Sequence, residues 1–119
     1  MIYHLVSREE WGGAVDTGIY QPPSLASEGF IHCSTVAQLA ATADTFFRDR
    51  RDLLALCIEE ALLMAPLRFE PPAAGPGANR SGDFPHIYGP LNLGAVVRVV
   101  DFPCGADGTF MLPPALAER

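Results

Sequence analysis

The sequence predicts an α+β fold in a single domain that covers residues 1–119. The length of 119 residues is typical of one domain. Hydrophobic residues make up 49% of the chain and charged residues 18%, which is a globular composition. The expected strands and helices are short and mixed, without the long crossover connections of parallel sheets. The chain is therefore expected to bury one core without metals or disulfides.

The first predicted elements are a strand and a short helix. Residues 2–6 read Ile-Tyr-His-Leu-Val and are typical of a strand. Ser7 and Glu10 then have the spacing of a capping box, in which each side chain satisfies a backbone amide at the start of a helix. Gly12 and Gly13 lower the helix propensity, so this helix should be short. Residues 16–27 carry glycine and two prolines and are expected to form a loop.

The middle of the chain predicts a strand, a helix and a second strand. Residues 29–33 read as a short strand. Thr35 and Gln38 form a second capping box, and the apolar residues of 36–48 fall on one face of the helix that follows. Residues 53–59 are almost continuously apolar and suit either a helix or a buried strand. Their short length and charged flanks favour the strand.

The last third of the chain contains strands separated by a long loop. Residues 67–70 alternate between apolar and polar side chains, as a strand does. Residues 71–83 are rich in proline and glycine and predict a long mobile loop, which could act as a lid. Two prolines in residues 84–91 exclude a regular helix there. The valine-rich segment 95–101 predicts a strand, and Asp107-Gly108 predicts a turn.

Charge and cysteine content restrict the partners and the compartment. The net charge of −6 makes a nucleic-acid partner unfavourable, because an acidic protein repels phosphates at long range. Cys33, Cys57 and Cys104 form no CxxC pair, and their odd number argues against a disulfide framework. The N-terminus does not resemble a signal peptide, and no stretch is apolar enough to span a membrane. We therefore expect a reduced, cytoplasmic protein without a membrane partner, with Cys57 in the core and Cys104 exposed.

Three histidines are the first candidates for chemistry. His4, His32 and His86 each lie in an apolar or aromatic segment. A buried imidazole needs partners for both ring nitrogens, so each could be a structural histidine or a functional one. On a strand, His32 and Ser34 point to one face and Cys33 to the other, so His32 and Cys33 are not expected to share a metal ion.

The start of the helix after residue 35 is a candidate anion site. Free amides and the positive end of the helix dipole favour a phosphate there, next to Ser34 and Thr35. Simple capping of the helix explains the same two hydroxyl residues without a ligand. Of the remaining candidates, Tyr88 could stack on a flat ring or pack in the core, and Glu70 ends a strand just before the mobile loop.

Three segments together resemble the bacterial family called domain of unknown function 952. They are Tyr3-His4-Leu5, residues 28–35 (Glu-Gly-Phe-Ile-His-Cys-Ser-Thr) and residues 84–91 (Phe-Pro-His-Ile-Tyr-Gly-Pro-Leu). The resemblance covers nearly the whole chain. That family is similar in fold to the ADP-ribosyltransferase superfamily, which implies a split α+β sandwich of two small sheets.

The order of the motifs also resembles the NAD-dependent RNA 2′-phosphotransferases of that superfamily. His4 matches their first strand histidine, and His32 with Ser34 matches their second motif. Residues 53–59 match their apolar strand, and Tyr88-Gly89 falls near their late segment.

The sequence also departs from those transferases at three places. Leu5-Val6 stands where they carry Gly-Thr, and Phe30-Ile31 stands where they carry an arginine. Their toxin-type relatives also have a late glutamate, for which Glu70 is the nearest but displaced candidate.

The resemblance implies an enzyme that acts on NAD or a related phosphorylated nucleotide as a transferase or hydrolase. In it, His4 would bind a ribose hydroxyl, Ser34 and Thr35 a phosphate, and Tyr88 a ring. The catalytic candidates are His4, His32, His86 and Glu70, with His86 or Glu70 steadying positive charge at the ribose carbon. One alternative is a nucleotide- or metabolite-binding module without catalysis. Another is a metal site of the three histidines. The sequence specifies neither the substrate nor the oligomeric state.

Overall fold

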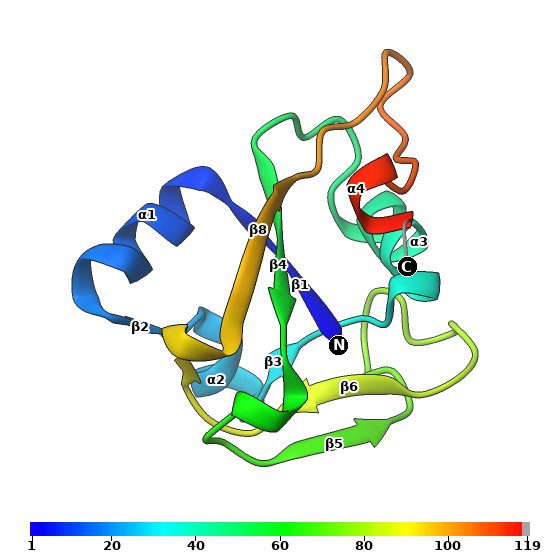
Figure 1. Ribbon diagram of the computed structural model, residues 1–119. Coiled ribbons are helices and arrows are strands. Elements are labelled where there is room, and N and C mark those ends of the chain that lie inside the picture. The colour runs from blue at the N-terminus through cyan, green and yellow to red at the C-terminus, as the bar shows by residue number, and fades with distance from the viewer. Residues whose placement is uncertain (118–119) are drawn as a thin grey trace.

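The computed structural model describes residues 1–117 and contains three small antiparallel sheets (Figure 1). The first sheet has the order β1-β4-β8, with β1 at Ile2–Ser7, β4 at Leu53–Ile58 and β8 at Val96–Asp101. The second has the order β3-β6-β5, with β3 at Ile31–His32, β6 at Phe84–Ile87 and β5 at Leu67–Glu70. A two-stranded ribbon pairs β2 at Ile19–Tyr20 with β7 at Leu91–Asn92.

Short helices surround these sheets, so the predicted α+β class is confirmed. The α-helices are α1 at Arg8–Thr17, α2 at Pro23–Glu28, α3 at Val36–Phe46 and α4 at Pro114–Ala117. Two single turns of 3-10 helix, η1 at Glu60–Leu62 and η2 at Leu93–Ala95, complete the elements. None of the helices within residues 1–117 is long and apolar enough to cross a membrane.

The central strand β4 is apolar throughout because both faces of the first sheet are covered. All six of its residues are buried. Leu54, Leu56 and Ile58 belong to a core cluster that includes residues of β3, β6 and β7. The alternate residues, among them Leu53 and Cys57, pack with Leu39 and Ala43 of α3. Burial on both faces removes the polar alternation of an ordinary antiparallel strand, so strand is the correct choice for this segment.

The predicted helix starts are confirmed by their hydrogen bonds. The Ser7 hydroxyl accepts a hydrogen bond from the Glu10 amide at 3.1 Å and so caps α1. At α3, the Thr35 amide donates to the Gln38 side chain at 2.9 Å. Each bond satisfies an amide that has no partner within its helix, which fixes where the helix begins.

The loop expected over residues 16–27 is wrong in part. Within it the chain forms β2 and begins α2. Pro22 is the N-terminal cap of α2, and Pro23 is its first residue. A proline in the first turn does not interrupt a helix, because the amide it lacks would be unpaired there.

Cys104 is buried, which contradicts the expected exposure. It packs in the α3 core cluster with Phe102 and Phe110. The predicted turn at Asp107-Gly108 is present and folds the chain back through a bond from the Gly105 amide to the Thr109 carbonyl. The Phe110 amide then donates to Asp44 of α3 at 2.8 Å, and this bond holds the turn over Cys104.

Gly108→Ala is expected to destabilise the fold by about 1–2 kcal/mol, because an alanine in the left-handed region is strained. Gly108 has φ of +84°, and an added Cβ would lie 2.0 Å from the Asp49 carboxylate oxygen. Gly12→Ala in α1 meets no atom within 4 Å and should stabilise by about 0.5–1 kcal/mol. Urea denaturation of both variants tests this, and equal effects would contradict it.

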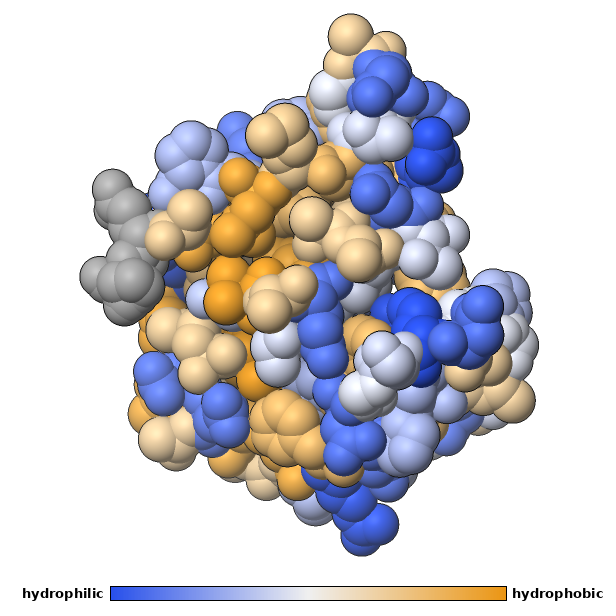
Figure 2. Space-filling view, turned by 90° about the vertical axis from the view of Figure 1, so that its right-hand side faces the viewer, coloured by the Kyte–Doolittle hydropathy of each residue, from blue (hydrophilic) through white to orange (hydrophobic). Residues whose placement is uncertain are grey.

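The two three-stranded sheets meet where a bridge joins Tyr3 to Ser34. The Tyr3 amide donates to the Ser34 carbonyl, and the Ser34 amide to the Tyr3 carbonyl, both at 2.8 Å. This bridge places β1 beside the end of β3. On the face that carries α3 and α4, apolar side chains gather into one area of the surface (Figure 2). Phe46 and Val36 of α3 are among the large apolar residues left exposed.

Candidate functional site

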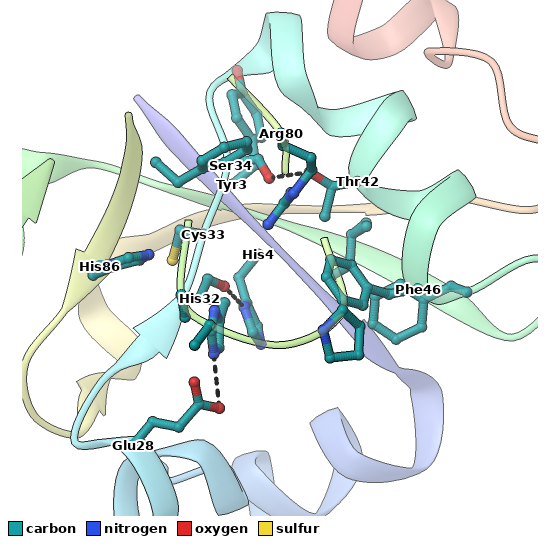
Figure 3. A pocket seen from close by; sticks show the side chains of 16 residues that line it. Tyr3, His4, Glu28, His32, Cys33, Ser34, Thr42, Phe46, Arg80 and His86 are labelled. Carbon is teal, nitrogen blue, oxygen red and sulfur yellow. Dashed lines mark hydrogen bonds and ion pairs between the residues drawn. The ribbon is translucent and has the colours of Figure 1, made fainter. Parts of the chain in front are cut away.

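A cavity of about 420 Å³ lies at this junction, between β1, β3, β6, α3 and the loop of residues 71–83 (Figure 3). The three histidines expected to carry chemistry, His4, His32 and His86, all line it, as does Ser34. The loop, predicted as a lid, contributes to its wall. The lining residues are Tyr3, His4, Leu5, Glu28, His32, Cys33, Ser34, Thr42, Phe46, Phe47, Ala73, Ala74, Pro76, Arg80, Phe84 and His86.

His86 is held from behind by Glu70. The His86 side chain is 3% exposed, and its Nδ1 lies 2.8 Å from Glu70 Oε1. The same oxygen accepts a bond from the Tyr88 hydroxyl at 2.5 Å. These two hydrogen bonds, the one from Tyr88 first, lower the pKa of Glu70, which therefore stays ionised. Since a carboxylate only accepts, His86 Nδ1 carries the proton, and Nε2 has no protein partner within residues 1–117.

Glu70 and Tyr88 therefore belong to the site but not to the cavity wall. Neither residue lines the cavity, whereas His86 does. Glu70 is partly buried, and the Glu70 bond raises the pKa of Tyr88. Phe30 stacks on His86 with ring centroids 4.1 Å apart and contacts the Tyr88 ring at 5.3 Å. Tyr88 thus packs behind the histidine here rather than offering a face to the cavity.

A second carboxylate–imidazole pair lies beside the first. His32 Nε2 is 3.1 Å from Glu28 Oε2, and both side chains are about 40% exposed, at 41% and 39%. His32 and His86 are direct partners in the register of β3 and β6. Their ring centroids are 5.7 Å apart, with the rings nearly perpendicular. Strand pairing alone therefore brings two imidazoles from distant segments into one cavity.

His4 has both ring nitrogens engaged by the protein. Nδ1 donates to the His32 carbonyl at 2.5 Å, since a carbonyl can only accept. Nε2 is then the acceptor and receives the Tyr20 hydroxyl at 2.8 Å. Burial lowers the pKa of His4 from 6.5 to about 4, although the hydrogen bond to the His32 carbonyl acts in the opposite direction. His4 is therefore neutral and fixes the backbone of β3, and a ribose hydroxyl would have to displace Tyr20 to reach it.

Arg80 supplies the cationic wall of the cavity. It comes from the loop of residues 71–83, and its guanidinium lies 4.0 Å from the Phe84 ring centroid and 5.1 Å from that of Phe46. Nε donates to the Gly77 carbonyl at 3.0 Å, and Nη1 to the Thr42 hydroxyl at 3.2 Å. An arginine has five N–H donors, so further donors remain available to a ligand. Burial lowers the pKa of Arg80, and the guanidinium stays charged.

Two hydroxyls extend this wall toward β3. Thr42 Oγ1 lies 3.0 Å from Ser34 Oγ. Because Thr42 accepts from Arg80, it can donate its own proton to Ser34, which leaves the Ser34 proton for a ligand. Arg80, Thr42 and Ser34 thus form a hydrogen-bonded chain, which we call the anion wall, and its two ends, Arg80 and Ser34, have donors for a ligand. Such a set suits a phosphoryl group.

The structure does not place Thr35 in the cavity. Its amide is bound by Gln38, and the Gln38 amide in turn donates to the Thr35 carbonyl at 3.1 Å. The start of α3 is thus closed by its own cap. The Ser34 hydroxyl turns to Thr42 in the middle of that helix.

The three histidines do not converge on a common point. Within residues 1–117, no three or more histidine, cysteine, aspartate or glutamate side chains are placed to hold a metal ion. Both nitrogens of His4 are engaged, as described above, so the geometry gives no support to the three-histidine metal site. Cys33 lines the cavity, but burial raises the pKa of its thiol, which disfavours a nucleophilic thiolate.

Sequence reasoning missed four contributors to the site: Arg80, Thr42, Tyr20 and Glu28, the partner of His32. Arg80 is the single basic residue of the segment 71–83, and this isolation is the one signal that could have revealed it. Thr42 lies six positions after Val36, the first residue of α3, and the pattern of apolar residues indicated only that this position belongs to a helix. Tyr20 fell in a segment expected to be loop.

The comparisons place this chain in a family. The family described as "Protein of unknown function (DUF952)" matches residues 5–99, so the chain belongs to that family. No curated protein matches the sequence.

Solved structures of protein CC0527 from Caulobacter crescentus are similar over almost the whole chain. Its crystal structure is 34% identical, with a TM-score of 0.83, and the match covers 98% of each chain. Its solution NMR structure is 32% identical, with a TM-score of 0.73, covering 98% of this chain and 96% of that one. A second crystal structure, of a double mutant, is 33% identical with a TM-score of 0.83.

Proposed function

We propose that the cavity binds a phosphorylated nucleotide and that the protein is an enzyme acting on it, as a transferase or hydrolase. The observation that carries this proposal is the anion wall of Arg80, Thr42 and Ser34 in the cavity that holds His32 and His86. A guanidinium with free N–H groups beside hydroxyls is suited to phosphate. The imidazoles on β3 and β6 are side chains that can accept or donate a proton.

The size of the cavity favours one nucleoside phosphate rather than a whole dinucleotide. Its 420 Å³ falls in the lower part of the range for ligand pockets, about 300–1,000 Å³. NAD, the candidate cofactor, would therefore place one mononucleotide half inside and leave the other at the mouth. Phe46 and Phe84 line the cavity and offer apolar surface to a base or nicotinamide ring.

We also propose the ADP-ribosyltransferase-like arrangement as the finer description of the fold. Two three-stranded antiparallel sheets with the cavity at their junction support it. The third, two-stranded ribbon is an addition to the two sheets that the resemblance implied. The cytoplasm is proposed as the compartment, because Cys33, Cys57 and Cys104 are all free thiols.

Binding of ADP-ribose, NAD and nicotinamide mononucleotide tests the nucleotide proposal by calorimetry and thermal shift. A ligand at a hundred times its Kd should stabilise by about 2.7 kcal/mol, which is several degrees in Tm. Thr42→Val removes one hydroxyl at nearly constant volume and should weaken ADP-ribose binding about 3–10-fold. Thr45→Val is the matched control on the same helix, since the Thr45 hydroxyl bonds only the Ala41 carbonyl. If none of the three nucleotides binds, the proposal is wrong.

The second candidate is a nucleotide- or metabolite-binding module without catalysis. It is favoured by His4, the match to the first transferase motif, whose ring nitrogens are both used for internal bonds. Such a module would bind ADP-ribose with the same dependence on Thr42. Incubation of bound nucleotides followed by chromatography separates the two candidates, because only the enzyme yields products.

A further inference from the structure

The two imidazoles of the cavity have opposite free nitrogens. His86 uses Nδ1 for Glu70, which leaves Nε2 for the cavity, whereas His32 uses Nε2 for Glu28, which leaves Nδ1. The rings are 5.7 Å apart, and both histidines line the cavity (Figure 3). A carboxylate on one nitrogen fixes the tautomer of the ring and supports a proton on it. The pair can therefore remove one proton and supply another on either side of a small group.

The anion wall lies about two residues along the strands from these imidazoles. Phe84 and His86 occupy alternate positions on β6, about 6.6 Å apart at the 3.3 Å rise of a strand. The Arg80 guanidinium lies 4.0 Å from the Phe84 ring centroid. Ser34 and His32 have the same spacing along the neighbouring segment. A phosphoryl group bound by Arg80 and Ser34 would thus reach toward both histidines with its ester oxygens.

The charges around the cavity favour a phosphate with a single negative charge. Arg80 is the only arginine or lysine among the residues that line it. Glu28 lies in the lining and opposes additional negative charge, whereas the charge of Glu70 behind His86 is partly offset by Arg68, the partner of His86 in the register of β5 and β6. A phosphodiester carries one charge, whereas a terminal phosphate approaches two at neutral pH. Given the volume of the cavity, the diester that fits inside it as a whole is a cyclic nucleotide.

We infer that the His32–His86 pair hydrolyses a nucleoside cyclic phosphodiester, a step that rests on the proposed nucleotide-binding function. His86 Nε2 takes a proton from water as the water oxygen forms a bond to phosphorus. The bond from phosphorus to one ribose oxygen breaks, and that oxygen takes the Nδ1 proton of His32 in its imidazolium form, whose Nε2–H is held by Glu28. One water is consumed and one nucleoside monophosphate is formed. Glu70 is a positioning residue that acts through His86.

The test is hydrolysis of adenosine 2′,3′-cyclic and 3′,5′-cyclic monophosphate by the purified protein, followed by chromatography with 5′-AMP as the monoester control. We expect one cyclic nucleotide to be opened and 5′-AMP to be left intact. His86→Gln and His32→Gln should each lower kcat about 100-fold or more, as loss of a general acid or base does. Glu60→Gln is the control, because Glu60 pairs with the N-terminus and does not line the cavity.

Glu70→Gln keeps a hydrogen-bond acceptor for His86 but removes the charge. It should lower kcat about tenfold and leave KM nearly unchanged, a separation that a merely structural role would not produce. This variant also keeps the inference testable if His86→Gln fails to fold. Full activity of folded His86→Gln, or an unchanged kcat in Glu70→Gln, would overturn it. ADP-ribose binding without cyclic-nucleotide hydrolysis would overturn the hydrolytic step and leave the nucleotide pocket standing, whereas absence of both would overturn both proposals.

Discussion

The protein is expected to lose about 2 kcal/mol of stability between pH 7.5 and pH 5, because folding keeps His4 neutral. The pKa of His4 is about 4 in the folded protein and 6.5 as the ordinary value. Between these values the unfolded chain binds a proton that the folded chain does not, so stability falls as the pH falls. The contribution is complete above pH 6.5 and lost near pH 4, where it totals about 3 kcal/mol. Urea denaturation at pH 7.5, 6 and 5 measures this slope.

His4→Gln separates this effect from those of other groups. The variant should be less stable at pH 7.5 but nearly independent of pH between 7.5 and 5. Lowered pKa values are also found for three carboxyl groups, those of Glu70, Asp52 and Asp107. Their contributions to the free energy of unfolding are lost only when the pH falls below the ordinary carboxylate range, near pH 4. Tyr20→Phe removes the hydrogen bond that neutral His4 accepts, so it should bring the folded pKa of His4 closer to 6.5 and make the loss of stability between pH 7.5 and 5 smaller. An unchanged slope in His4→Gln would refute the assignment to His4.

The elements that the sequence predicted well are those whose causes are local. The caps at Ser7 and Thr35 depend on residues three positions apart, and both helices begin where the spacing predicts. The strand at 53–58 was recognisable because burial on both faces leaves an unbroken apolar run. The errors have tertiary causes. Cys104 has proline and glycine neighbours typical of an exposed turn, but contacts to α3 cover it.

The candidate site also combines features that local sequence predicts with contacts that only the tertiary fold creates. The three histidines could be found by inspection, because a chain with so few titratable groups in apolar segments draws attention to them. The partners that define their chemistry could not. Glu70 reaches His86 through the pairing of β5 with β6 across the long loop, and no local spacing predicts that register. Arg80 enters the cavity only because the loop folds over α3 to bond Thr42.

Arg80→Gln is expected to weaken ADP-ribose binding about 10–100-fold. A hydrogen bond to a charged group is worth about 1.5–3 kcal/mol, and the variant removes both the charge and the fork of donors. Arg80→Lys keeps the charge but not the planar contact with Phe84, so it should recover only part of the affinity. Calorimetric titration with ADP-ribose at two salt concentrations measures both losses. High salt should reduce the part of the binding free energy that comes from the Arg80 charge. This reduction should be smaller than at an exposed site, because Arg80 is partly buried.

Arg50→Gln is the matched control for this prediction. Arg50 is an exposed arginine that pairs with Asp52 through Nε and Nη2, and it does not line the cavity. Its loss changes the net charge of the protein by the same amount as Arg80→Gln, so a general electrostatic effect would weaken binding equally in both variants. A loss confined to Arg80→Gln assigns the phosphate to the anion wall. Wild-type affinity in a folded Arg80→Gln variant would mean that the nucleotide binds elsewhere. It would also refute the inference that a phosphate bound by Arg80 reaches the His32–His86 pair.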